Sequence, residues 1–298
     1  MKNIYEQVDE NKFRSVVVIT SFIVFITAAS YLITYSLGYD LSAVGIALVL
    51  SGVFSFIGYY NSDKIILGIS GASPANKRDH FEFYTVTENL ARVARIPMPK
   101  LYVIDDTAMN AFATGRDPEH AVVCATTGIL SKLNRTEMEG VVAHELSHIR
   151  NYDIRLMSIV TILVGLVTLL ADILLRTRIR GKSDREGGNL GAILMIAGII
   201  MALLSPIVAQ LIQLAISRRR EFFADASGAL LTKYPAGLAS ALEKISADKE
   251  PLEAANKATA HLYIVNPLKN HHDSIGWFAG LFNTHPPVKE RIKALRGV

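Results

Sequence analysis

Two long uncharged stretches near the N-terminus limit what this chain can fold into. Residues 16–36 (VVVITSFIVFITAASYLITYS) contain no charged side chain, and residues 41–60 form a second such stretch after the short sequence LGYD. A helix rises about 1.5 Å per residue, so the first stretch is long enough for the roughly 30 Å hydrocarbon core of a bilayer. It is longer than the apolar part of a signal peptide, and a second apolar stretch follows it. The sequence therefore predicts a transmembrane hairpin in residues 1–61.

Two further apolar runs lie at 156–175 and 191–216 and are interrupted by Asp172 and Pro206, respectively. Their lengths suit membrane helices, but a pair of long helices in a soluble core fits the same pattern. We therefore expect up to four transmembrane helices. The second hydrophobic hairpin, at about 156–216, would interrupt the polar part of the chain, residues 62–298.

Composition narrows the possible partners and metal ligands. Half of the 298 residues are hydrophobic, and the net charge is only +4. The basic clusters at 176–180 and 218–220 flank apolar runs, which predicts contact with membrane lipid and no nucleic-acid partner. Cys124 is the only cysteine, so the chain forms no internal disulfide and any metal site must use histidine and carboxylate ligands.

The polar part predicts an α+β fold that is predominantly α-helical. Residues 81–96 are helix-like and end before Pro97, and strand-like segments at 101–105, 110–115 and 120–126 indicate a small antiparallel sheet. A helix is expected to begin at Thr136, where Thr136 and Glu139 match a capping box. Residues 217–234 and the C-terminal segment 284–295 are also helix-like.

The helix expected after Thr136 contains His144, Glu145 and His148, which spell H-E-x-x-H. Histidines four residues apart lie on one helix face, about 6 Å apart along the axis, so both imidazoles can bind one ion. In hydrolytic zinc sites an open coordination position holds a water, and a carboxylate that is not a ligand accepts its proton. Glu145 is the candidate for that base. The motif by itself is short enough to arise by chance.

A third protein ligand must come from elsewhere in the chain. The extension H-E-x-x-H-x-x-G-x-x-H fails, because Asn151 and Ile154 stand where glycine and histidine are required. The chain also lacks the N-P-D-G type segment of proteases whose H-E-x-x-H lies within a membrane span.

Glu221 is the best candidate for the third ligand. If the run between His148 and Glu221 crosses the membrane twice, both residues lie on one side at similar depth. Asp225 would share a helix face with Glu221 and could accept an imidazole N–H. A solvated charged face beside the arginine cluster explains the same pair. Other candidates are weaker: His271, His272 and Asp273 in a polar loop, and His285, which suits a structural hydrogen bond.

Five motifs occur in the order found in one known family: NAFATG (110–115), TTGIL (126–130), HELSHIRNYD (144–153), EFFADASGA (221–229) and THPP (284–287). The chain thus resembles the HtpX-type membrane zinc endopeptidases, relatives of the CAAX prenyl endopeptidases. The resemblance implies a gluzincin-like protease domain with one Zn²⁺ on His144, His148 and Glu221, and with Glu145 as the catalytic base.

The resemblance also implies protein or peptide substrates and a stress-response role in membrane protein quality control. It further implies an integral protein of a bacterial or archaeal cell membrane, with the active site facing the cytoplasm. Two alternatives remain open on the sequence. One is a prenyl-protein-type protease, which needs a large lipid-accepting chamber. The other is a non-enzymatic membrane transporter or a zinc-responsive scaffold.

Overall fold

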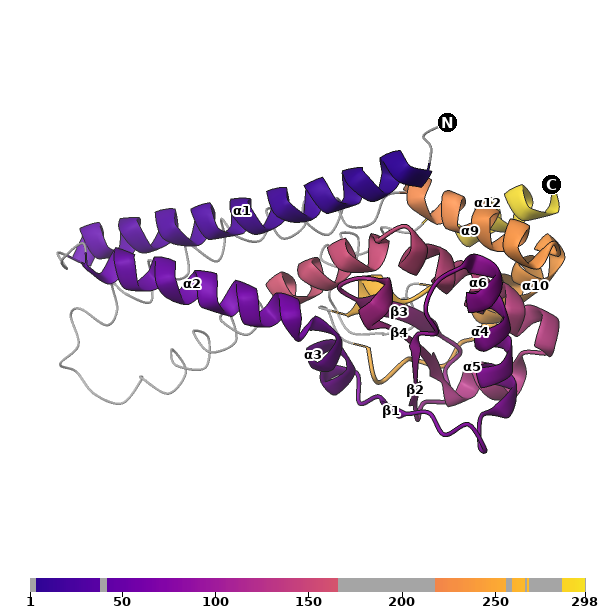
Figure 1. Cartoon of the computed structure of the whole chain (residues 1–298). Coiled ribbons are helices and arrows are strands. Elements are labelled where there is room, and N and C mark those ends of the chain that lie inside the picture. The colour runs from indigo at the N-terminus through magenta and orange to yellow at the C-terminus, as the bar shows by residue number, and fades with distance from the viewer. Residues whose placement is uncertain are drawn as a thin grey trace.

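The computed structural model describes residues 4–37, 42–165, 218–255, 259–265, 267 and 286–297 (Figure 1). Most of the second hydrophobic hairpin predicted at 156–216 lies outside these residues. So do the candidate residues His271, His272, Asp273 and His285.

The N-terminal part forms a helical hairpin. Helix α1 (Ile4–Leu37) and helix α2 (Ser42–Tyr60) lie side by side and project away from the rest of the molecule (Figure 1). Helix α3 (Ser62–Ile69) then leads into the sheet. Within the described residues, no helix has both the length and the apolar character needed to cross a membrane. The two helices predicted at 16–36 and 41–60 are present, but over the described residues neither meets the criteria for a transmembrane helix.

The sheet contains four strands in the order β1 (Ser73–Pro74), β2 (Lys100–Ile104), β4 (Ala121–Thr126), β3 (Ala111–Gly115). Strands β3 and β4 are joined by the short 3₁₀ helix η1 (Pro118–His120) and pair antiparallel, as do β1 and β2. Strand β4 enters between β2 and β3, so β2 and β4 run parallel. The prediction of an antiparallel sheet was therefore wrong: the sheet is mixed.

Helix α4 (Phe81–Ala94) is capped by Arg95, which has a left-handed backbone with φ of 56° and lies two residues before Pro97. The motif-bearing helix α6 (Arg135–Arg150) follows the short helix α5 (Thr127–Lys132). Its capping box is formed by Asn134 and Glu137, not by Thr136 and Glu139 as predicted. Asparagine caps a helix as well as threonine does, and Asn134 has the extended backbone that an N-cap requires.

Helix α6 is the central helix of the part of the molecule that follows the hairpin. It packs against α4, strand β3, α9 (Arg218–Thr232) and α10 (Pro235–Ala247), and most of its residues are buried. The 3₁₀ helix η2 (Ala260–Leu262) lies beside β3, and helix α12 (Val288–Arg296) packs on α9 and α10. After α6 the chain turns at Tyr152, whose φ is 60°, into a helix that the structure describes over 153–165.

Candidate metal centre

Close packing of two helices brings the candidate ligands together. A side chain at Gly228 of α9 would place its Cβ 3.1 Å from the backbone nitrogen of His144 on α6. The absence of a side chain at this position allows the two backbones to approach closely. Glu221, two turns earlier on α9, therefore reaches the imidazoles of His144 and His148.

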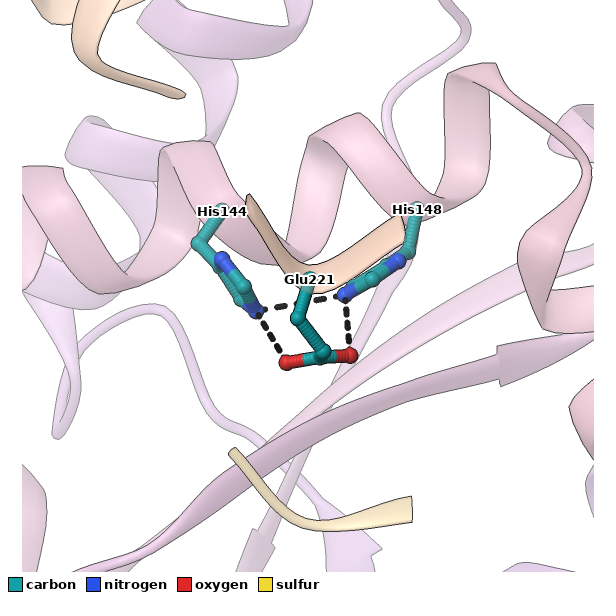
Figure 2. A group of neighbouring side chains, drawn as sticks. All are labelled: His144, His148 and Glu221. Atoms are coloured by element: carbon teal, nitrogen blue, oxygen red, sulfur yellow. Dashed lines mark hydrogen bonds and ion pairs between the residues drawn. The ribbon is translucent and has the colours of Figure 1, made fainter. Parts of the chain in front are cut away.

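Three donor atoms converge at this place (Figure 2). The Nε2 atoms of His144 and His148 are 3.2 Å apart. The carboxylate of Glu221 lies 3.8 Å from Nε2 of His144 and 3.6 Å from Nε2 of His148. Ligands about 2.0–2.1 Å from a tetrahedral zinc are roughly 3.3–3.4 Å from one another, so these separations fit a single ion. All three side chains are buried.

Each histidine is oriented by a carboxylate on its other ring nitrogen. Nδ1 of His144 lies 2.9 Å from Oδ1 of Asp225, and Nδ1 of His148 lies 3.0 Å from Oδ2 of Asp153. In metal sites such pairs orient the ring so that its Nε2 can bind an ion. The predicted contact between Asp225 and an imidazole is confirmed. The partner of His148 was not predicted.

A buried arginine balances the negative charge at this centre. Arg291 of α12 has no exposed surface and donates two hydrogen bonds to Asp225, at 2.8 and 2.7 Å. Its Nη1 donates to the carbonyl of Ile264 at 2.9 Å and lies 3.4 Å from Glu221. Although burial opposes the charged carboxylate, Arg291 keeps the pKa of Asp225 below its ordinary value.

Glu145 faces the sheet from the same helix. Only 2% of its surface is exposed, and it accepts a hydrogen bond from the backbone of Ala113 in β3, an edge strand of the sheet. Burial raises the pKa of Glu145 to about 7, although the charge of His148 opposes this shift. A carboxylate with a pKa near neutrality can both accept and donate a proton at physiological pH.

Sequence reasoning missed Asp153 and Arg291. Asp153 lies five residues after His148 and within the motif HELSHIRNYD, so a search for carboxylates near the histidines could have found it. Arg291 carries no local signal, because an arginine in the sequence VKERIKAL is typical of an exposed helix.

The two histidines differ in their affinity for protons. Burial and the charge of Arg291 lower the pKa of His144, although the hydrogen bond that its ring N–H donates to Asp225 raises it. Burial also disfavours a charged His148, but Asp153 and Glu221 outweigh it and raise the pKa of His148 to about 9. A metal ion must therefore displace a proton from His148 at neutral pH.

This proton sets a testable pH dependence. The pKa of His148 in the folded protein lies above the ordinary value of about 6.5, so the imidazole is protonated below pH 9 and metal affinity falls as the pH falls. From pH 8.5 to pH 7 we expect an affinity loss of about 30-fold, one decade per pH unit. Zinc titration against a competing chelator measures this. An affinity that stays constant above pH 7 is the result for an ordinary histidine and contradicts the shift.

The site has the features of a metallopeptidase. Two histidines lie on one helix, an acidic donor lies on a second helix, and a buried glutamate stands beside them outside the donor set. The chain belongs to peptidase family M48, whose model matches residues 79–298. The predicted resemblance to the HtpX-type proteases is thereby confirmed.

Two relatives are similar to the chain over almost its whole length, and each is named Protease HtpX homolog. The one from Thermoanaerobacter pseudethanolicus is 41% identical over 301 residues, which cover 100% of this chain and 98% of the relative. The one from Dictyoglomus thermophilum is 44% identical over 298 residues, which cover 98% and 94%. Among solved structures, the chain is similar to a crystal structure of S. mikatae Ste24p, with 19% sequence identity and a TM-score of 0.49. The match covers 98% of this chain and 66% of that one.

Proposed function

We propose that the chain is a membrane-anchored zinc endopeptidase in which His144, His148 and Glu221 bind one zinc ion and Glu145 is the general base. The observation that carries this proposal is the convergence of three buried donor atoms beside a fourth acidic residue that is not a donor. Within the described residues, only these three side chains form such a cluster. A structural zinc requires a fourth protein ligand, so this donor set favours a catalytic site over a scaffold.

The donor set suits zinc in particular. Two imidazole nitrogens and one carboxylate oxygen are the ligands of many hydrolytic zinc sites, whereas calcium and magnesium prefer oxygen alone. When bound, zinc lowers the pKa of a water and polarises the carbonyl of the peptide bond.

Residues of the chain then transfer the protons and orient the ligands. Glu145 accepts a proton from the attacking water and passes it to the amide nitrogen of the leaving segment, for which a pKa of about 7 is suitable. Asp153 and Asp225 keep both imidazoles in their metal-binding orientation throughout.

Removal and return of the metal test this function. The purified chain is expected to cleave an unfolded protein such as casein, to lose this activity with a chelator, and to regain it with one equivalent of zinc. The HtpX-type resemblance supports misfolded or membrane-associated proteins as substrates, so a stably folded soluble protein is the matched control and is expected to stay intact. Cleavage that persists after complete zinc removal contradicts the proposal.

Membrane attachment by the α1–α2 hairpin is supported by its surface. Apolar side chains are exposed along both helices, and those of Phe13 and Val49 are 69% and 65% exposed. Exposed apolar side chains over such a length are typical of a surface that contacts lipid. Nine basic residues flank the predicted membrane segments on the side of the site, against five in residues 176–186 and none in residues 37–40, which supports a cytoplasmic active site. They are Lys2, Lys12, Arg14, Lys64, Arg150, Arg155, Arg218, Arg219 and Arg220.

Cysteine labelling tests the orientation. Cys124 is the only cysteine and is buried, so a single introduced cysteine dominates the labelling. We expect an impermeant maleimide to label Lys100→Cys from the cytoplasmic face and Tyr39→Cys from the opposite face. Labelling of both positions from one face would show that the hairpin does not cross the membrane.

A further inference from the structure

The N-terminal helix contributes a buried polar side chain close to the metal centre. Asn11 of α1 is 3% exposed, although α1 is otherwise rich in exposed apolar side chains. One turn before the apolar stretch, its amide inserts between the turn after α6 and the start of α9. The neighbouring Lys12 lies over the ring of Tyr152, 4.7 Å from its centre, and so contacts the same turn.

The amide of Asn11 uses both its donor and its acceptor. Its Nδ2 donates to the carbonyl of Asn151 at 2.9 Å and to Oδ1 of Asp153 at 2.7 Å. Its Oδ1 accepts from Nη1 of Arg220 at 3.1 Å. A carbonyl and a carboxylate cannot donate and a guanidinium cannot accept, so the neighbours determine the orientation of the amide.

These partners lead directly to ligands on two different helices. Asp153 uses its other oxygen, Oδ2, to hold Nδ1 of His148 at 3.0 Å. Arg220 immediately precedes Glu221 on α9. Asn11 therefore connects the turn that orients one ligand with the residue next to another.

We propose that Asn11 is a positioning residue of the metal site, through which docking of α1 on the protease domain controls metal affinity. The inference rests on the proposed zinc function. A buried amide with three hydrogen-bonded partners stabilises one arrangement of those partners. Another arrangement would leave a buried polar group without its hydrogen bond, which costs free energy. In this arrangement Asp153 is held at the distance from which it orients His148.

The test compares Asn11→Asp with a control on the same helix. Asn11→Asp keeps the shape, removes both N–H donors and places a second carboxylate against Asp153. Loss of a carboxylate that supports a metal-bound histidine lowers metal affinity about 10–100-fold. Asn11 is one hydrogen bond further from the metal than such a carboxylate, so we expect Asn11→Asp to bind zinc about 10-fold more weakly. Ser15→Ala removes another buried polar group one turn away, whose hydroxyl donates to the backbone carbonyl of Asn11, and is expected to leave zinc affinity unchanged.

Three readouts separate positioning from general destabilisation: zinc affinity by chelator competition, the visible absorption of the Co²⁺-substituted protein, and kcat with KM. Altered Co²⁺ bands, lower kcat and unchanged KM support the proposal when Asn11→Asp and Ser15→Ala melt alike in the metal-free state. If Asn11→Asp does not fold, Asn11→Ala takes its place, because Arg220 and Asp153 already lie 3.8 Å apart and can still pair when the amide is removed.

Wild-type zinc affinity in a folded Asn11 variant overturns the inference and leaves the zinc function intact. Absence of zinc binding by the wild-type chain overturns the proposed function itself.

Discussion

Replacement of Glu145 by glutamine is expected to abolish proteolysis and to leave one zinc ion bound per chain. The amide has the same shape but cannot accept a proton, and loss of a general base costs about 10²–10⁴-fold in rate. Zinc is retained because Glu145 is not among the converging donors. Its negative charge helps to raise the pKa of His148, so its removal also weakens proton competition at that ligand.

Glu139→Gln is the matched control for this variant. Glu139 is on the same helix and pairs with Arg135 on the surface, 3.1 Å away, so activity and zinc content are expected to stay at wild-type levels. Rates are measured on one unfolded substrate, and zinc by elemental analysis of the same preparations. Activity of Glu145→Gln within 10-fold of wild type, or zinc loss in that variant, would contradict the role of general base.

Replacement of Glu221 by glutamine is expected to act on zinc affinity instead. The change removes the only anionic donor of the cluster and leaves Arg291 beside a neutral amide 3.4 Å away. We expect an affinity loss above about 100-fold, larger than that for groups that only orient a ligand. Excess zinc is then expected to restore part of the activity, which it cannot do for Glu145→Gln.

Glu243→Gln is the control here, because Glu243 lies on the exposed side of α10 and pairs with Arg296. Chelator competition gives the affinities, and activity at saturating zinc gives the recovery. Wild-type zinc affinity in Glu221→Gln would remove Glu221 from the ligand set.

The elements that carry the proposed ligands could be predicted from sequence because their signals are local. His144 and His148 are one helical turn apart, and Glu221 and Asp225 are likewise one turn apart, so helix geometry alone places each pair on one face. The ordered motifs then linked the two helices. The structure brings all four side chains to one centre.

The groups that support the ligands could not be predicted, because tertiary packing brings them from distant parts of the chain. Asn11 contacts Asp153 across 142 positions, and Arg291 reaches Asp225 across 66. In the sequence each looks like an ordinary polar residue on a helix. Only burial, at 3% and 0% exposure, distinguishes them.

The predictions of an antiparallel sheet and of the start of α6 were wrong for a related reason. Strands β2, β3 and β4 were placed correctly and the two-residue strand β1 was missed, but entry of β4 between β2 and β3 depends on packing against the helices and leaves no local signal. At α6, Asn134 and Thr136 both suit an N-cap, and each is followed three residues later by a glutamate. Asn134 is the N-cap because its partner Glu137 is buried, where it accepts a hydrogen bond from Lys244 of α10 at 2.7 Å.

X-ray absorption at the zinc edge of the purified wild-type chain tests the central claim most directly. The account predicts one zinc per chain with two imidazole nitrogens and two oxygens, one from Glu221 and one from solvent, at about 2.0–2.1 Å. It also predicts no sulfur ligand, because Cys124 is buried in a separate cluster with Phe112 and Tyr263. A zinc–sulfur distance of about 2.3 Å, or three or more imidazoles around the ion, would contradict the assignment of His144, His148 and Glu221 as the complete protein ligand set.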